Sequence, residues 1–486
     1  MSLQNIAGRK EEIRKLERVL RSDQPELIAV YGRRRVGKTF LIREYFTERI
    51  CFELTGIHGA TLREQLNNFA QTLTDSTGFG IPLKAPTSWQ EAFAQLKAFL
   101  GQHKQKGKKV VFLDELPWLN TPRSGFLKHL EHFWNSFGSR QKDLVLILCG
   151  SAASWMIQHI IDSKGGLHNR ITCHIRLMPF RLSETMEYLE KRKIRQLDRY
   201  QALLLYMALG GVPYYWSFVQ RQHSAAHAID DIIFAHEAPL KEEYKNLFAS
   251  LFEQNDQHEQ VILALAGKKK GLKRNELLTR ARMSSGGGAS RVIYELETSG
   301  FISSYIPFGK RNKDALYRIS DEYILFHHTW ISPLGRHQPG NGYWMKKQSG
   351  PRYHAWSGYC FEGICAKHIP QIKYHMRIDQ IASNESPWEY RPERGSGDEG
   401  VQIDLLIDRQ DMVINVCEMK FCRSGFSIEA AYAKDLRRKM EVFRKQTRTR
   451  KALFLTMITT FGLNENTHSH SLNAIDVTMD ALFESN

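Results

Sequence analysis

Short apolar runs alternate with helix-like segments through the first 180 residues. The runs with the length and composition of strands cover residues 27–31, 50–54, 110–114, 144–149 and 173–178. Segments with helical periodicity separate them, for example 89–100 and 125–137. Strands that alternate with helices predict a parallel sheet covered by helices on both faces. Because ligands of such sheets bind at the carboxyl ends of the strands, the reactive groups are expected there.

One motif at the end of the first run points to a specific chemistry. Residues 32–39 fit the pattern G-x-x-x-x-G-K-[ST], and a helical pattern follows them, a context that a glycine turn with a stray lysine does not explain. Backbone N–H groups and the positive end of the helix then converge on phosphates. We predict that ATP binds here, with Lys38 on its β- and γ-phosphates and Thr39 on Mg²⁺. The predicted nucleotide-binding residues are Gly32, Arg33, Arg34, Arg35, Val36, Gly37, Lys38, Thr39 and Phe40.

The third and fourth runs end in residues that suit phosphoryl transfer. Asp114 and Glu115 follow four apolar residues, which predicts Asp114 beside Mg²⁺ and Glu115 at the attacking water. Ser151 is placed to hydrogen-bond the γ-phosphate or the water. Arg170, in a Gly-rich loop, is a candidate arginine finger for the ATP of a neighbouring subunit. The alternatives are a helix-capping role for the acidic pair and a solvated loop position for Arg170.

The middle of the chain predicts a helical segment and then a separate small unit. Residues 181–250 have helical patterns, and three further helices start near residues 261, 273 and 289. Two strands, 301–306 and 315–319, follow around a basic turn, an order typical of a winged helix-turn-helix. The functional interpretation is DNA contact by the third helix, and the alternative is a protein-contact module. Arg291 favours DNA contact, whereas Glu295 and Glu297 on the same helix oppose it.

A Gly- and Pro-rich stretch, residues 331–352, predicts a linker before a C-terminal domain. In that domain two strands, 401–407 and 412–420, form a predicted hairpin. The period of two places Glu418 and Lys420 on one side, and the hairpin brings Asp404 beside them. Two carboxylates suit Mg²⁺, which polarises a phosphodiester and activates water, and Lys420 suits the orientation of that water. Glu362, on the preceding helix, is a candidate further ligand.

The alternative interpretation of the Glu418–Lys420 pattern is a strand that ends in a surface salt bridge, because E-x-K alone is a weak motif. The helix that follows strengthens the catalytic interpretation. Between residues 427 and 451 nine lysines and arginines accompany three acids. A basic helix beside a metal site suits a phosphate backbone, and a merely solvated basic face is the other possibility.

Composition narrows the class of protein and its partners. A length of 486 residues predicts about three or four domains. The net charge of +16 favours a polyanionic partner, nucleic acid first and anionic lipid second, although a basic enzyme without such a partner stays open. No apolar run reaches the roughly 18 residues that a membrane helix needs, and no secretory leader is recognisable. The seven scattered cysteines lack metal or disulfide spacing, so a reducing, cytoplasmic location is expected.

The first 250 residues resemble the AAA+/STAND group of P-loop ATPases, and more narrowly the archaeal-type ATPases that carry a winged helix and a further C-terminal domain. The resemblance rests on residues 8–12, 32–39, 114–118, Ser151 and 210–213. It implies an extra strand, 144–149, between the two nucleotide-binding strands, an opening Gly-Arg element near the adenine, a helical lid and a homo-oligomer. No lid arginine at the γ-phosphate is assignable, in contrast to the group.

The C-terminal domain resembles the PD-(D/E)XK nuclease fold over residues 352–465. The resemblance rests on Asp404, on Glu418-Met419-Lys420 and on the order of helix, hairpin, helix and strand. The usual proline before the aspartate is replaced by Ile403. This resemblance implies a restriction-endonuclease-like α/β fold and metal-dependent cleavage of DNA, in preference to RNA.

These patterns predict an α/β protein with five parts. They are a P-loop ATPase domain with a parallel sheet (1–180), a helical lid (181–254), a winged helix (255–330), the linker (331–352) and the nuclease-like domain (353–486). The leading hypothesis is an ATPase coupled to metal-dependent processing of double-stranded DNA. The rivals are a nucleotide-switched signalling scaffold whose nuclease-like domain only binds, and a motor that remodels protein or DNA.

Overall fold

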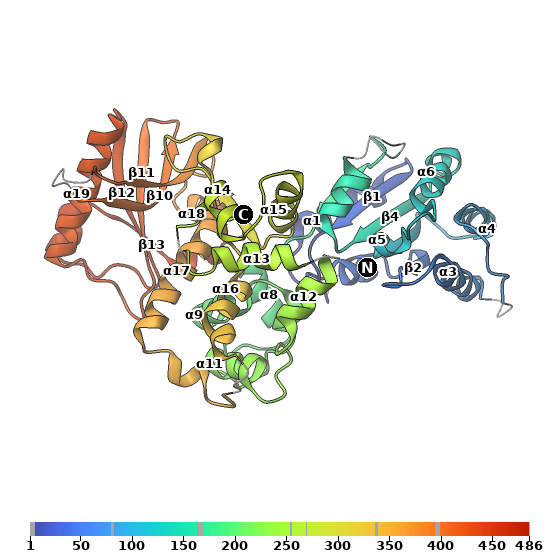
Figure 1. The fold of residues 1–486 in the computed structure, drawn as a ribbon, viewed down its shortest axis with the longest axis horizontal. Helices are drawn as coiled ribbons and strands as arrows, with labels where there is room; N and C mark the ends of the chain where they lie inside the picture. The colour runs from blue at the N-terminus through green and yellow to red at the C-terminus, as the bar shows by residue number, and fades with distance from the viewer. Residues whose placement is uncertain are drawn as a thin grey trace. The chain divides into compact units, whose positions relative to one another are not determined.

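The structure, a computed structural model, describes residues 5–78, 82–162, 165, 167, 169–252, 255–268, 270–335, 339–393 and 399–485. It divides into two compact units, which are described separately. The N-terminal unit comprises Met1–Pro179 with Ala249–Glu253, and the C-terminal unit comprises Phe180–Phe248 with Gln254–Asn486. Figure 1 shows both units and labels many of their helices and strands.

The N-terminal unit is built on a five-stranded sheet of order β2-β3-β4-β1-β5, in which every neighbouring pair is parallel. The predicted alternation of strands and helices is confirmed. So is the placement of the fourth run as the extra strand, because β4 lies between β1 and β3. The elements are α1 (Lys10–Arg21), β1 (Glu26–Tyr31), α2 (Lys38–Phe46), β2 (Ile50–Thr55), α3 (Leu62–Thr77), α4 (Trp89–Gln102), β3 (Lys109–Asp114), α5 (Leu116–Leu119), α6 (Phe126–Ser136), β4 (Leu144–Gly150), α7 (Ala153–Met156) and β5 (Cys173–Arg176).

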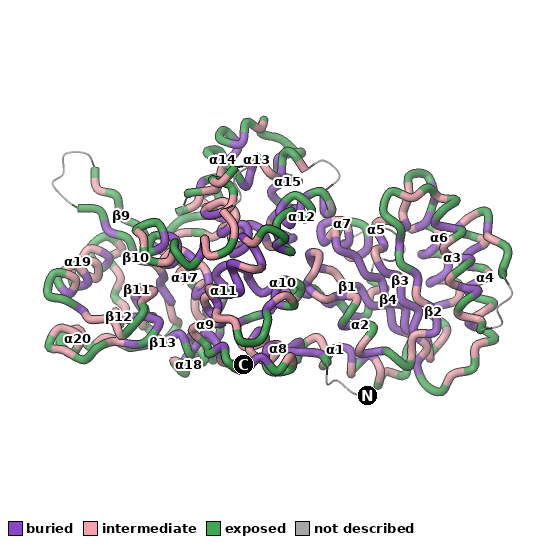
Figure 2. The backbone as a smooth tube through the Cα atoms, turned by 90° about the horizontal axis from the view of Figure 1, so that it is seen from below, coloured by how far each residue is buried: buried purple, intermediate pink, exposed green. Residues whose placement is uncertain are grey.

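Both faces of this sheet are covered, and its inner strands β3, β4 and β1 are almost entirely buried. Leu27 and Ala29 of β1 pack into a core with helices α3, α4 and α6, whereas Ile28 and Val30 pack into a second core with α1 and α2. Figure 2 shows strands β1 to β4 as buried. A parallel sheet needs this double cover, which leaves the loops at its carboxyl edge as the place for polar chemistry.

The C-terminal unit begins with helices and a small antiparallel sheet. The helices are α8 (Leu182–Lys191), α9 (Arg199–Leu209), α10 (Pro213–Trp216), α11 (Ala225–Ile229), α12 (Glu243–Leu251, which includes residues of both units), α13 (Asp256–Leu265), α14 (Arg274–Arg280), α15 (Gly287–Thr298) and α16 (Glu322–Phe326). The sheet has the order β6-β8-β7, from β6 (Leu272–Lys273), β7 (Ile302–Tyr305) and β8 (Leu316–Ile319). Helices α13 to α15 and the hairpin β7–β8 lie where the sequence predicts them, and the two-residue strand β6 has no counterpart in the predicted pattern.

A mixed five-stranded sheet of order β13-β12-β11-β10-β9 forms the second half of this unit. Strands β9, β10 and β11 are antiparallel, and β12 and β13 run parallel to β11. The buried residues Ala433, Leu436 and Phe443 pack α19 against the sheet. The elements are α17 (Pro351–Lys367), α18 (Ile369–His375), β9 (Ser383–Tyr390), β10 (Val401–Arg409), β11 (Val413–Lys420), α19 (Ala430–Thr447), β12 (Ala452–Thr459), α20 (Thr467–Leu472) and β13 (Ile475–Thr478).

The stretch 331–352, predicted as a linker, is anchored where the structure describes it. The Asp230 carboxylate accepts hydrogen bonds from the backbone N–H groups of Gly342 and Trp344. The Trp344 ring is buried against Phe326, Trp330 and Trp356. The glycines and prolines of this stretch therefore accompany a packed segment with tight turns rather than an extended connection.

Candidate functional site

The phosphate-binding motif forms a sharp loop between β1 and α2. Gly32 has φ 151°, and a Cβ atom there would lie 2.2 Å from the carbonyl oxygen of Leu177. Gly37, with φ 90°, ends the loop, and a Cβ atom there would meet nothing within 4 Å. Helix α2 begins at Lys38, so its free N–H groups belong to the motif itself.

The ammonium group of Lys38 lies at the centre of this site. It is buried and donates to the carbonyl oxygens of Gly32 and Arg33, both at 3.0 Å, and to the hydroxyl of Ser151 at 2.9 Å. Ser151 in turn donates from its hydroxyl to Glu115 at 2.6 Å and from its N–H at 3.2 Å. The structure therefore joins three predicted residues from three different strand ends into one chain of hydrogen bonds.

The two predicted metal-binding residues of this unit are also in contact. The Thr39 hydroxyl donates to the Asp114 carboxylate at 2.7 Å, and the other oxygen of Asp114 accepts from the N–H of Glu115 at 2.9 Å. Glu115 has a left-handed backbone, φ 47° and ψ 50°, and its carboxylate contacts Ser151 whereas that of Asp114 contacts Thr39. A hydroxyl and a carboxylate side by side beneath a helix N-terminus form the hard-oxygen donor set that Mg²⁺ takes, so the residues fit a magnesium nucleotide.

The other residues of the predicted nucleotide set differ in their surroundings. Arg33 is buried, whereas the guanidinium of Arg34 lies 5.5 Å from the ring centre of Trp118. Arg35 has φ 68°, and the Phe40 side chain is half exposed. Arg170 is exposed, and its backbone N–H donates to the carbonyl oxygen of Leu167.

Arg9 is a part of this site whose contacts the sequence does not predict. Its guanidinium is buried and donates to the carbonyl oxygens of Val36 at 3.0 Å and Met178 at 2.7 Å. Arg9 thus holds the phosphate loop against the segment that follows β5. The resemblance indicates an element near the adenine at this position, but no local spacing identifies the two carbonyl partners.

The first prediction concerns Gly32, where any side chain meets the Leu177 backbone. Gly32→Ala is expected to lower the free energy of unfolding by at least about 2 kcal/mol, because neither backbone segment can give way without strain. Gly101→Ala, on α4 where a Cβ atom meets nothing within 4 Å, is the matched control and is expected to be neutral or stabilising. Urea unfolding followed by circular dichroism measures both, and equal stability of the two variants would contradict this account.

The predicted acidic pair of the C-terminal unit meets where the paired part of the β10–β11 ladder ends. Leu405 pairs with Cys417 across the antiparallel ladder, so the next position along places Asp404 opposite Glu418 on the same face. The Asp404 carboxylate accepts from the N–H of Met419 at 3.1 Å. Lys420 lies with its Nζ 3.7 Å from a Glu418 oxygen. The hairpin thus gathers Asp404, Glu418 and Lys420.

Glu418 is more deeply buried and has more hydrogen-bond partners than its sequence pattern predicts. It is 1% exposed, and both of its oxygens lie 2.8 Å from Nζ of Lys439, on α19. The hydroxyl of Tyr432 donates to it at 3.1 Å. Burial and the nearby charge of Asp404 raise the pKa of Glu418, and Lys439 and Lys420 oppose that rise. Lys439 is therefore a member of this site that appears in the sequence only as one of nine basic residues.

Glu362, the candidate further ligand, does not complete a metal cluster. Among the described residues no group of three or more His, Cys, Asp or Glu side chains is arranged to hold a metal ion. Glu362 is half-buried on α17, and Asp404 and Glu418 supply the acidic part of this site without it. Two facing carboxylates still have the chemistry of a divalent-cation site, with open coordination positions left to water or substrate.

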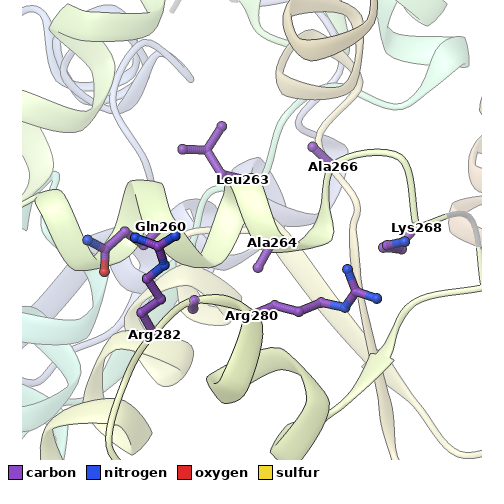
Figure 3. A pocket seen from close by; sticks show the side chains of 8 residues that line it. Gln260, Leu263, Ala264, Ala266, Lys268, Arg280 and Arg282 are labelled. Carbon is purple, nitrogen blue, oxygen red and sulfur yellow. The ribbon is translucent and has the colours of Figure 1, made fainter.

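A shallow pocket of about 420 Å³ lies on helices α13 and α14 (Figure 3). Its lining combines the apolar residues Leu263, Ala264, Ala266 and Ala281 with Gln260 and the cations Lys268, Arg280 and Arg282. A second pocket, of about 520 Å³, lies beside α19 and is lined by Arg437, Met440, Glu441, Arg444, Lys445 and Leu453. Both pockets carry an excess of cationic side chains, as surfaces for polyanions do.

The expectation that Glu295 of α15 opposes contact with DNA needs a correction. Glu295 is buried, and its carboxylate pairs with His258 at 2.8 Å and with Arg291 at 2.8 Å, because the helix turns this position toward α13. The exposed residues of α15 include Ser290, Arg291 and Tyr294. Glu295 therefore does not repel a polyanion from this helix.

The strand order and the phosphate loop together define the N-terminal unit as a P-loop ATPase. Residues 6–219 match the family described as "ATPase domain predominantly from Archaea". This part of the chain is therefore an ATPase domain of the archaeal type, which binds a nucleotide. None of the described helices is both long and apolar enough to cross a membrane.

Proteins similar to the chain include two curated relatives and one solved structure. An uncharacterized protein of Methanocaldococcus jannaschii is 22% identical over 82% of this chain and 84% of its own length. An uncharacterized ATP-binding protein of the same organism is 49% identical over 44 residues, 9% of this chain and 75% of its own length. A Walker-type ATPase of Pyrococcus abyssi has a TM-score of 0.51 at 20% identity, over 67% of this chain and 97% of that one.

Proposed function

We propose that the chain hydrolyses ATP in its N-terminal unit and processes DNA at a metal-dependent acidic site in its C-terminal unit. The observation that carries the first part is the hydrogen-bonded chain from Lys38 through Ser151 to Glu115 beside the Thr39–Asp114 pair. The second part rests on the facing carboxylates of Asp404 and Glu418 with Lys420 beside them.

In the proposed ATPase reaction each residue has a distinct task. The loop 32–39 binds the phosphates through its N–H groups, and Lys38 exchanges the carbonyl oxygens of its own loop for phosphate oxygens. Thr39 and Asp114 offer oxygen ligands to Mg²⁺, which neutralises phosphate charge when it is bound. Glu115 orients the attacking water and accepts its proton, and Ser151 keeps that carboxylate in position.

The residues of the proposed DNA-processing site also have distinct tasks. Asp404 and Glu418 supply oxygens to Mg²⁺, which polarises the phosphodiester when it is bound. Lys420 orients water or stabilises developing negative charge. The basic surface of α19 and the proposed winged helix, α13 to α15 with β6 to β8, hold the phosphate backbone, so binding is expected to weaken as salt increases.

The proposal includes a homo-oligomer, in which Arg170 of one copy contacts the ATP that a neighbouring copy binds. The side chain is exposed on the loop before β5, where it is available to the ATP of a neighbouring copy. Mixing a Glu115→Gln chain with an Arg170→Ala chain tests this contact. Restored ATP hydrolysis in the mixture supports it, and mixtures that stay as inactive as the separate chains contradict it.

A second candidate function is a nucleotide-switched scaffold whose C-terminal unit binds DNA without cutting it. The observation that favours it is the Lys439 ammonium group on both oxygens of Glu418. The two candidates differ in one measurable property, which is cleavage of DNA in the presence of Mg²⁺.

Nicking of labelled double-stranded DNA with Mg²⁺, with and without ATP, tests the proposal. Asp404→Ala is expected to slow nicking by about 100-fold or more, because the loss of a metal ligand removes several kcal/mol of transition-state stabilisation. Asp408→Ala, on the same strand but paired with Lys451 at 2.6 Å, is the matched control and should nick normally. If neither the unchanged chain nor Asp408→Ala nicks DNA, the scaffold function replaces the cutting function.

A further inference from the structure

The contact between Lys439 and Glu418 has the geometry of an occupied cation site. The Lys439 Nζ lies at 2.8 Å from each oxygen of the Glu418 carboxylate. The Lys439 side chain is 15% exposed, and that of Glu418 is 1% exposed. An ammonium group that bridges both oxygens of one carboxylate takes the place that a divalent cation takes in bidentate coordination.

We infer that Lys439 is the resident cation of this site, so that a divalent metal ion reaches Glu418 only by displacing its ammonium group. The inference rests on the proposed metal-dependent function, which it deepens by naming how the site is regulated. It assigns Lys439 a positioning role, because the residue acts through Glu418.

Because Glu418 is buried, the Lys439 ammonium group and a divalent metal ion cannot contact its carboxylate at the same time. A carboxylate this deeply buried needs a positive charge within contact distance, since an unpaired buried charge is strongly destabilising. Lys420 is a weaker partner, because its Nζ is 3.7 Å from the carboxylate and 5.3 Å from the ring centre of Tyr432. In the metal-free protein Lys439 supplies the positive charge that the Glu418 carboxylate requires. A metal ion that binds the same carboxylate repels the Lys439 ammonium group.

The surroundings of Lys439 offer a place to which its ammonium group can withdraw. Asp435, one helical turn earlier on α19, already lies 3.9 Å from Nζ. The same helix carries the exposed basic residues of the proposed DNA surface. A phosphate backbone on this helix draws Lys439 outward and thereby opens Glu418, so DNA and metal are expected to bind with positive coupling.

Calorimetric titration of the full-length, nucleotide-free chain with Mn²⁺ tests the inference without any activity measurement. Lys439→Met is expected to bind Mn²⁺ at least tenfold more tightly than the unchanged chain. Lys434→Met, an exposed lysine of the same helix, is the matched control and should bind like the unchanged chain. A short DNA duplex should tighten Mn²⁺ binding to the unchanged chain and leave Lys439→Met unaffected.

Thermal unfolding provides a second readout. Without metal, Lys439→Met should have a lower Tm than the unchanged chain, and Mn²⁺ should restore it, whereas adding Asp404→Ala to this variant should abolish the restoration. Lys439→Gln keeps a hydrogen-bond donor to Glu418 and replaces Lys439→Met if that variant does not fold. Equal Mn²⁺ affinity in all chains overturns the role of Lys439 but leaves the metal site intact. No Mn²⁺ binding by any chain, Lys439→Met included, overturns the proposed metal function itself.

Discussion

Lys38→Ala is expected to abolish detectable ATP binding, with an affinity at least about 100-fold below that of the unchanged chain. The ammonium group of Lys38 is buried among the carbonyl oxygens of its own loop and the Ser151 hydroxyl, so little reorganisation separates it from bound phosphates. Charge-assisted hydrogen bonds of this kind contribute about 1.5–3 kcal/mol each, and alanine removes them all. Equilibrium titration with a fluorescent ATP analogue measures the loss.

Lys108 offers a matched control, because it is a second buried lysine that donates to backbone carbonyl oxygens. Its partners, Gln24 and Lys142, immediately precede β1 and β4, so Lys108 lies at the amino edge of the sheet, away from the phosphate loop. Lys108→Ala is expected to destabilise the N-terminal unit but to keep the ATP affinity of the unchanged chain. If both variants lose affinity equally, the loss reflects destabilisation, and the phosphate-binding role of Lys38 is refuted.

The nucleotide site was predictable because its parts are local in sequence or lie at strand ends. The loop 32–39 is continuous, and a parallel sheet brings the ends of β3 and β4 to the same edge. Asp114 and Ser151 therefore meet this loop without any assumption about distant contacts. The partners of Arg9 were not predictable in this way, because both are backbone carbonyls, one of them 169 positions away.

The acidic site of the C-terminal unit shows the same division between local pattern and distant contact. Alternation along two strands and one tight hairpin place Asp404 opposite Glu418, and both features are visible in the sequence. Lys439 reaches the site through the rotation of α19 against the sheet, which depends on buried residues such as Leu436 and Phe443. A basic residue on a helix carries no mark that distinguishes a buried ion pair from a solvated charge, so this contact appears only in the structure.

Glu295 and Glu418, for which the sequence pattern indicates accessible positions, show why the burial of a charged side chain is hard to infer. Glu295 pairs with His258 of α13, a partner 37 positions away, and this contact takes it out of the face that was expected to repel DNA. Glu418 lies near the end of the apolar strand β11, but its degree of burial depends on α19 covering it. In both cases the sequence predicts the element that carries the glutamate, α15 or β11. The packing of another helix against it, α13 or α19, determines how deeply the carboxylate is buried.

Glu115→Gln is expected to bind ATP normally and to hydrolyse it about 10²–10⁴-fold more slowly, the usual contribution of a general base. Glutamine has the size of glutamate, and its single side-chain oxygen accepts one of the two Ser151 hydrogen bonds while its amide N–H₂ donates to the Ser151 hydroxyl, so the left-handed turn at this residue is retained. It loses the negative charge that orients water and takes up its proton. Phosphate release under saturating ATP measures kcat, and the analogue titration measures Kd.

Glu53→Gln is the matched control for this variant, because Glu53 lies on β2 of the same sheet and pairs with Arg43 at 2.7 Å on the outer surface. It is expected to leave both kcat and Kd unchanged. Equal turnover by Glu115→Gln and the unchanged chain removes Glu115 from the proposed role, and the Ser151 contact is then structural. A parallel loss of ATP affinity would indicate instead that the Glu115 charge holds Ser151 and Lys38 in place, which is a positioning effect that the Kd separates from the chemical step.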